Sequence, residues 1–125
     1  MISVQEVIEI HYILIERFGG AKGIRDRGLL ESAVRRPFQT FDGIELYPLP
    51  IEKAAAIFES IVCNHPFIDG NKRIAWVLLR LTLLNKSCDV RASENDKYEF
   101  VMNAASGKLN FEEIRLWIEQ HVVSR

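Results

Sequence analysis

Nine consecutive residues in the middle of the chain suit phosphate chemistry better than they suit a stable helix. They run from His65 to Arg73 and read His-Pro-Phe-Ile-Asp-Gly-Asn-Lys-Arg. The segment lies between two strongly apolar stretches that we expect to be helical, so its middle should be a loop that leads into a helix N-terminus. Free backbone N–H groups at such a terminus, beside a glycine that permits close approach, form a natural binding site for an anion.

The start of the second helix carries two cations where the helix dipole disfavours them. Asp69 suits the N-cap position, and residues 70–72 would then form the first turn. Glycine in a helix costs about 1 kcal/mol relative to alanine, and each cation at a helix N-terminus costs about 0.3–1 kcal/mol. Lys72 and Arg73 are therefore best explained by a phosphate group that binds here, with Gly70 and Asn71 in the turn that surrounds it.

Three side chains of this motif have both a structural and a chemical interpretation. His65 could simply favour the C-terminus of a helix, but four residues before a phosphate site it is also a candidate general base. Asp69 could be an N-cap only, or a ligand of Mg²⁺, which typically binds one or two carboxylates together with nucleotide phosphates. Arg73 suits bidentate phosphate binding, although a solvated surface arginine is the alternative. We interpret Phe67 as a core anchor of the loop.

The nine residues resemble the signature of the Fic/Doc superfamily, His-x-Phe-x-Asp/Asn-Gly/Ala-Asn-Lys/Gly-Arg. Lys72 points to the Doc (death-on-curing) toxin branch, because typical Fic AMP-transferases carry glycine at this position. Those AMP-transferases also carry a second arginine where this chain has Trp76. Residues 28–33 followed by Arg36-Pro37 are similar to an early helix and loop of the Doc family.

The resemblance implies a toxin of a toxin–antitoxin pair. Such a protein would be an ATP-dependent kinase that phosphorylates a threonine of elongation factor Tu and halts translation, with Mg²⁺ as cofactor and ATP presenting its γ-phosphate. The implied roles are His65 as catalytic base, Asp69 as Mg²⁺ ligand, and Gly70, Asn71, Lys72 and Arg73 as phosphate-binding residues. AMP transfer to a protein hydroxyl is the enzymatic alternative. A non-catalytic binding module with a vestigial site is disfavoured because the motif is complete.

Self-inhibition is not expected. Many Fic proteins carry an inhibitory helix with the pattern Ser/Thr-x-x-x-Glu-Gly/Asn, and Glu94-Asn95 fails it because Val90 stands four residues earlier. The resemblance therefore implies a separate Phd-like antitoxin whose disordered tail folds into a groove of this protein.

Apolar patterning indicates how the motif is positioned. The helix that Pro50 begins, ending near Asn64, and the helix after the motif are apolar nearly all round, so both belong in the centre of the fold. This pattern places the phosphate site at the buried axis, where a low dielectric would strengthen its interactions with an anion. Residues 37–49 form an irregular stretch that could be a substrate-holding flap, as in Fic proteins, or a simple connector.

Local signals predict the remaining helices of an all-α, compact Fic/Doc-type fold with one domain over residues 1–125. A capping box at Ser3–Glu6 opens a helix that ends at residues 18–20. Asp26 begins a short helix to about Arg36, Ser93 begins one to about Ala105, and the last helix starts at Asn110. Residues 88–90 should be extended. His11 and His121 are expected to lie away from the motif in structural roles, with Trp76 and Trp117 in the core.

Composition favours a cytoplasmic protein. The 125 residues are 48% apolar and 26% charged with a net charge of −1, which argues against direct nucleic-acid binding and against binding to an anionic membrane. Cys63 and Cys88 form no CxxC motif and are expected to be reduced thiols in or near the core. Glu6 and Glu9 stand where a signal peptide would carry basic residues. The longest apolar runs are too short to span a bilayer.

Overall fold

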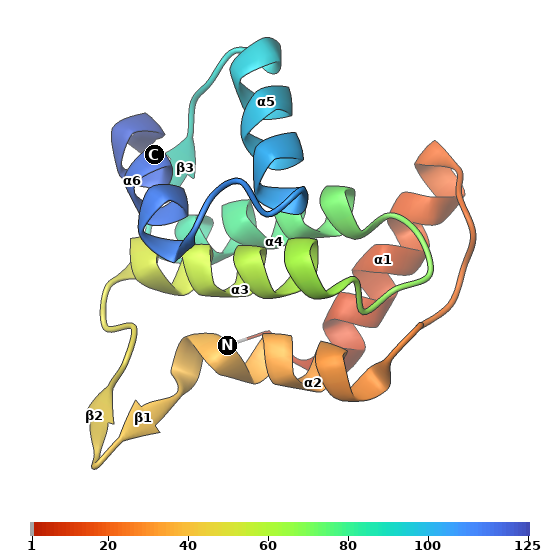
Figure 1. Ribbon diagram of the computed structural model, residues 1–125, viewed down its shortest axis with the longest axis horizontal. Coiled ribbons are helices and arrows are strands. Elements are labelled where there is room, and N and C mark those ends of the chain that lie inside the picture. Colours follow the sequence, from red (N-terminus) through yellow and green to blue (C-terminus); the bar gives the residue numbers. More distant parts are fainter. Residues whose placement is uncertain (1) are drawn as a thin grey trace.

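The computed structural model describes residues 2–125, in which six α-helices dominate (Figure 1). The helices are α1 Val4–Phe18, α2 Arg27–Arg35, α3 Pro50–Asn64, α4 Asn71–Leu84, α5 Glu94–Ala105 and α6 Phe111–His121. A 3₁₀ turn, η1, covers Arg36–Phe38. Two short antiparallel pairs join β1 Thr40–Phe41 to β2 Ile44–Glu45, and β3 Cys88–Val90 to β4 Val122–Ser124. The predicted all-α fold is confirmed.

Most helix starts follow from local sequence. The side chains of four N-cap residues each accept a hydrogen bond from a backbone N–H of the first turn; these residues are Ser3, Asp26, Ser93 and Asn110. Each such cap contributes about 1 kcal/mol to helix stability. Pro50 is the first residue of α3, where its missing N–H has no consequence because the first turn has no intrahelical acceptor for it.

The helices α3 and α4 lie side by side through the middle of the molecule, with α5 and α6 packed on one side and α1 and α2 on the other (Figure 1). Their fully buried side chains form the core, among them Phe58, Ile61, Ile74, Leu78 and Leu79. Burial of each such side chain stabilises the fold by about 1.5–3 kcal/mol. The prediction that these two helices are central and flank the motif is confirmed.

An aromatic cluster covers one side of this pair. Trp76 of α4 and Trp117 of α6 are half-buried and pack against Phe100 of α5. His121 stacks on Trp117 at 3.9 Å and is bonded to the Trp117 carbonyl at 2.7 Å. These contacts agree with a structural role for Trp76, Trp117 and His121.

The expectation that both thiols lie in or near the core is wrong for Cys63, which is exposed at the end of α3.

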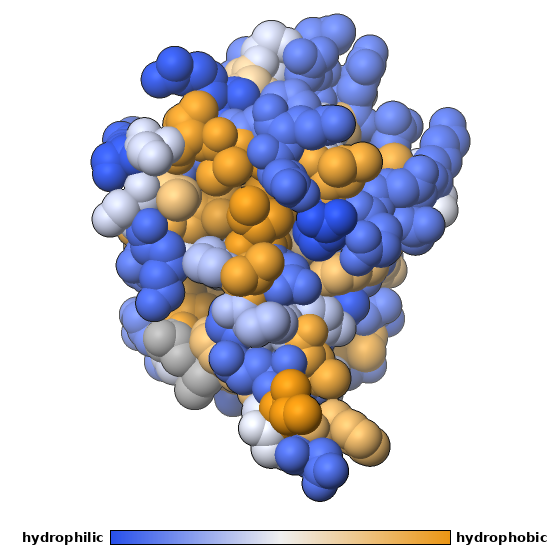
Figure 2. Space-filling view, turned by 90° about the vertical axis from the view of Figure 1, so that its left-hand side faces the viewer, coloured by the Kyte–Doolittle hydropathy of each residue, from blue (hydrophilic) through white to orange (hydrophobic). Residues whose placement is uncertain are grey.

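Residues 37–49 are more ordered than the sequence indicated, because they form η1 and the β1–β2 hairpin. Asp42 and Gly43 both have positive φ, 55° and 79°, as a tight two-residue hairpin turn requires. Figure 2 faces this end of the molecule, where the hairpin projects with Phe41 75% and Ile44 71% exposed.

The hairpin precedes α3, whereas the motif follows α3. At about 1.5 Å per residue, the 15 residues of α3 separate the two by roughly 22 Å. A flap role for the hairpin stays a prediction.

Two cations fasten the base of the hairpin to α3. Arg36 donates to the Tyr47 hydroxyl at 3.1 Å and to the Ser60 hydroxyl at 3.0 Å. Lys53 donates to the Glu45 carboxylate at 2.8 Å and to the Tyr47 carbonyl.

Among residues 2–125, no helix is both long and apolar enough to cross a membrane.

The β3–β4 pair is held to α4 by a carboxylate. Asp89 is 6% exposed and accepts two hydrogen bonds from Arg80, at 2.9 and 2.7 Å, and one from Arg125. The Arg80 guanidinium, joined by the Val90 N–H and Arg125, holds the pKa of this carboxyl well below its usual range. Asp89 is therefore a carboxylate ion in the folded protein at neutral pH.

We expect Asp89→Asn to lower the free energy of unfolding at neutral pH by about 1–3 kcal/mol, because it removes a charge-assisted contact. The pKa of Asp89 is lowered by folding, so its contribution is complete above the unfolded-state value of about 3.9 and is lost progressively as the pH falls from there toward the much lower folded-state value. The difference between wild type and variant in urea unfolding should therefore shrink below about pH 4. Asp42→Asn, at the exposed hairpin tip, is the control. A difference that stays constant as the pH falls below about 4 would contradict the assignment.

Candidate phosphate-binding site

The helix α3 ends at Asn64, and the next residue, His65, caps it with a left-handed backbone conformation of φ 50° and ψ 62°. Pro66 follows and has no N–H with which to continue the helix. The His65 side chain is exposed. The chain then reverses direction and enters α4 at Asn71, so residues 65–70 form the whole connection between the two central helices. This motif loop carries the predicted general base at its first position.

A segment from the N-terminal part of the chain runs alongside the motif loop. We call this segment, Gly20–Asp26, the strap. The backbone N–H groups of Arg25 and Asp26 donate to the Pro66 carbonyl at 2.8 and 3.0 Å. In the other direction, the Ile68 N–H donates to the Gly23 carbonyl at 3.0 Å. The strap therefore satisfies backbone groups of the loop that neither neighbouring helix can reach.

Phe67 anchors the middle of the motif loop in the core, as predicted, and is 1% exposed. Its ring stacks on His11 of α1 at 3.8 Å with the planes 8° apart. The buried His11 is also bonded through Nε2 to the Asp69 carbonyl at 2.8 Å, so this nitrogen is the donor. The expectation that His11 lies away from the motif is therefore wrong. Its structural role stands, because it holds the loop rather than facing solvent.

Asn71 closes the loop from the other side. Its side chain accepts from the Phe67 N–H at 3.0 Å and donates to the Phe67 carbonyl at 2.9 Å. The residue is only 9% exposed. Both polar atoms of the Asn71 side chain therefore help to hold the loop, which leaves the backbone N–H and the second N–H of the side-chain amide as donors.

The helix α4 begins one residue later than the sequence indicated. Gly70, not Asp69, occupies the N-cap position, with φ 75° and ψ 15°. Glycine adopts this left-handed conformation without steric cost, which explains its place in the motif. The first intrahelical hydrogen bond is donated by the Ile74 N–H to the Gly70 carbonyl at 3.0 Å. The N–H groups of residues 71–73 come before it and are directed out of the helix end.

The Asp69 carboxylate bonds to the strap instead of capping α4. It accepts from the Ala21 N–H at 3.1 Å and from the Gly70 N–H at 2.8 Å. These two backbone hydrogen bonds lower the pKa of Asp69, so the side chain is an exposed carboxylate ion. Each oxygen retains a lone pair, and such a donor fits Mg²⁺. Within residues 2–125, no group of three His, Cys, Asp or Glu side chains is suited to a metal. A metal held here would therefore depend on Asp69 together with phosphate groups of a bound ligand.

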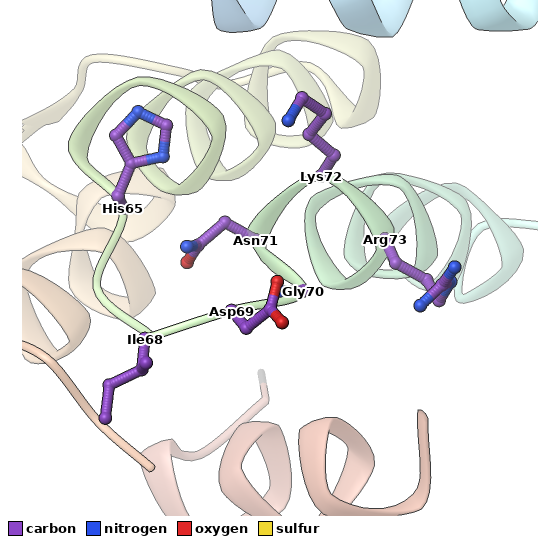
Figure 3. A pocket seen from close by; sticks show the side chains of 7 residues that line it. All are labelled: His65, Ile68, Asp69, Gly70, Asn71, Lys72 and Arg73. Atoms are coloured by element: carbon purple, nitrogen blue, oxygen red, sulfur yellow. The ribbon is translucent and has the colours of Figure 1, made fainter. Parts of the chain in front are cut away.

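The structure brings all six predicted site residues together around one cavity of about 360 Å³. Its lining residues are His65, Ile68, Asp69, Gly70, Asn71, Lys72 and Arg73 (Figure 3). The side chains of His65 and Lys72 lie on the same side of the loop in Figure 3, while Arg73 points away from them. The Arg73 guanidinium lies over the ring of Phe18 at 4.7 Å.

The cavity is open to solvent, so its predicted placement at the buried axis of the fold is wrong. Apolar side chains fill the space between α3 and α4, and a polar loop that joins the ends of two such helices can lie only at the surface. His65, Asp69, Lys72 and Arg73 are all exposed. An anion bound at such an exposed site would be held less strongly and with more sensitivity to salt than in a buried site.

Comparison with known proteins agrees with the motif. The family model described as the Fic/DOC family matches residues 1–83. The chain belongs to the Fic/DOC family. The matched region contains both the strap and the motif loop and ends within α4, whereas α5 and α6 follow it. The predicted resemblance is thus confirmed at the level of the family.

One curated protein is similar to this chain over part of its length. It is Toxin Doc of Mycolicibacterium smegmatis, which is 51% identical to this chain over 59 residues. The aligned segment covers 47% of this chain and 45% of that toxin, so less than half of the relative is matched.

The Fic/DOC signature does not by itself reveal the supporting residues outside the motif. His11, Ala21 and Arg25 contact the loop from positions 40 or more residues earlier in the chain. The only sequence signal for the strap is its glycines. A Cβ atom at Gly20 would lie 2.8 Å from Asp69 Oδ2, and one at Gly23 would lie 2.9 Å from Ile68 Cδ1. Both positions have positive φ, which favours glycine, and a Cβ atom there would in addition displace the end of the neighbouring side chain.

The strap gives a prediction with a matched control. Gly19 and Gly20 both have positive φ, but a Cβ atom at Gly19 would meet no atom within 4 Å. Alanine at either position should cost about 1–2 kcal/mol of backbone strain. Gly20→Ala should cost about 1–3 kcal/mol more, because the Asp69 carboxylate must leave the Ala21 N–H. Urea unfolding of the two variants measures this difference. Equal stabilities would show that the close approach of strap and carboxylate is unimportant.

Proposed function

We propose that this chain is the toxin of a toxin–antitoxin pair and a protein kinase that transfers the γ-phosphoryl group of ATP to a threonine of elongation factor Tu. The observation that carries the proposal is the gathering of His65, Asp69 and Lys72 around one cavity at the N-terminus of α4. The family and the partial match to a protein named Toxin Doc support it. The match covers less than half of that relative. The activity proposed for this chain therefore depends on its own residues and not on the name of the relative.

Each residue has a role that its surroundings suit. The exposed His65 imidazole can accept the proton of an incoming threonine hydroxyl. The hydroxyl oxygen bonds to the γ-phosphorus, the bond from that phosphorus to the β–γ bridging oxygen breaks, and ADP leaves. The N–H groups of residues 71–73, with the Lys72 and Arg73 cations, bind the nucleotide phosphates. Asp69 would hold Mg²⁺, which when bound neutralises charge on the phosphates.

The residues after the motif favour the kinase over AMP transfer. In AMP-transferring members of the family, glycine replaces Lys72 and a second arginine replaces Trp76. Here Trp76 packs at 6.2 Å against Trp117 and at 6.4 Å against Phe100, so it belongs to the aromatic cluster. Residue 76 therefore lacks the positive charge that would bind the diphosphate of a nucleotide in the orientation used for AMP transfer. The ammonium of Lys72 also takes up space beside the N-terminus of α4.

A separate antitoxin is the proposed partner. A second cavity of about 990 Å³ lies between α1, the hairpin, α3 and α4, with Ile10, Phe38, Ile57 and Leu81 among its lining residues. It shares no lining residue with the motif cavity. An amphipathic or extended segment that orders on binding could bury its apolar side chains there.

Incubation of elongation factor Tu with this protein, Mg²⁺ and ATP should add the mass of one phosphate to the factor. His65→Ala should slow the reaction by about 10²–10⁴-fold, since it removes the general base. His121→Gln, in the aromatic cluster, should leave the rate unchanged. Intact-mass spectrometry of the factor measures each outcome. Addition of one AMP would overturn the kinase assignment, and an unmodified factor would overturn the proposed target.

Lys72 should matter as a phosphate ligand. Lys72→Ala is expected to reduce the rate of phosphoryl transfer by about 100-fold, in line with the loss of one charged contact to the reacting group. The control is Lys108→Ala, an exposed lysine between α5 and α6. Rates are followed by ADP release at saturating ATP, and circular dichroism checks the fold. An unchanged rate for Lys72→Ala would remove this residue from the site.

A further inference from the structure

The backbone of His65 is held in a conformation that its sequence disfavours. Its φ of 50° and ψ of 62° place a residue with a Cβ atom in the left-handed region, which few non-glycine residues adopt. In addition, a residue that precedes proline is pushed toward extended conformations by the proline ring. A strained residue of this kind persists only where its surroundings determine its conformation, and such residues gather at functional sites.

The surroundings that determine it come chiefly from one side chain of the strap. Arg25 donates from Nε to the His65 carbonyl and from Nη2 to the Asn64 carbonyl, each at 2.6 Å. The planar guanidinium is well suited to bind two neighbouring oxygen atoms at once. These carbonyls end α3, where the helix dipole also favours a cation. The Arg25 N–H additionally fixes the next peptide through the Pro66 carbonyl at 2.8 Å.

We infer that Arg25 is a positioning residue for His65. Its guanidinium fixes the two peptides before Pro66 and thereby the direction in which the imidazole leaves the backbone. Arg25 is not among the residues that line the motif cavity, so it acts through His65 and not on a phosphate. The inference rests on the proposed function only in taking His65 as the base. The placement of the imidazole by Arg25 is a property of the protein that can be measured without any substrate.

The first measurement is therefore made on the protein alone. A two-dimensional ¹H–¹³C NMR spectrum of the imidazole Cε1–Hε1 groups contains one signal for His65, which is assigned by its loss in His65→Ala. We expect Arg25→Gln to shift or broaden the His65 signal and to leave that of His121 in place. The matched control is Arg27→Gln, an exposed arginine two residues later that pairs with Glu31 at 3.5 Å. It should leave both signals in place.

The second measurement uses phosphoryl transfer to elongation factor Tu. Arg25→Gln should lower kcat by about tenfold or more, as expected for a misplaced base, while the KM for ATP changes by less than about threefold. Arg25→Lys keeps the charge without the planar fork and should restore part of kcat. Arg27→Gln should match the wild type in kcat and KM.

The outcomes separate this inference from the proposed function. An unmoved His65 signal in Arg25→Gln would overturn the inference, whether or not the kinase is active. A raised KM with unchanged kcat would also overturn it, because Arg25 would then contact the nucleotide. A wild type without kinase activity refutes the proposed function, and the NMR comparison still decides the role of Arg25. Should Arg25→Gln fail to fold, Arg25→Lys must shift the His65 signal for the inference to stand.

Discussion

The connection between the two central helices has six residues, and the rest of the site depends on how its polar groups are bonded. The loop must bury Phe67 to seal the end of the core, so its backbone is drawn away from water. Each backbone N–H or carbonyl that loses water without a new partner costs about 1–3 kcal/mol. Because α3 ends before the loop and α4 begins after it, the backbone ladders of the two helices cannot supply those partners. The strap, His11 and the Asn71 side chain supply them instead.

This constraint explains why the motif contains both buried structural residues and exposed residues to which the proposed function assigns the chemistry. Phe67 and Asn71 face inward and are buried, and their contacts set the shape of the loop. His65, Lys72 and Arg73 face outward and are exposed. Asp69 stands between these roles, since its carbonyl is bonded to His11 while its carboxylate remains open to solvent. A substitution in the first group should therefore affect the fold, and a substitution in the second should mainly affect chemistry.

Local sequence was sufficient to predict most elements but not the supports of the site. The helix starts after Ser3, Asp26, Ser93 and Asn110 were predictable because a cap depends on residues within one turn. The same rule failed at Asp69, because its carboxylate accepts from the Ala21 N–H of the strap and from the Gly70 N–H instead of from an N–H within α4. His11 lies 58 residues from the carbonyl that it binds, and no periodicity in the sequence specifies that contact.

The exposure of the site follows from the same packing and changes how its cations must work. Arg73 lies over the ring of Phe18 at the surface, and an exposed contact of this kind contributes about 0.5–1 kcal/mol. A hydrogen bond from a guanidinium to a charged phosphate contributes about 1.5–3 kcal/mol. An arriving phosphate can therefore draw Arg73 from the ring, whereas the N–H groups of residues 71–73 are already fixed by α4. Under the proposed function, the backbone part of the site would be preorganised, and Arg73 would be the part that moves.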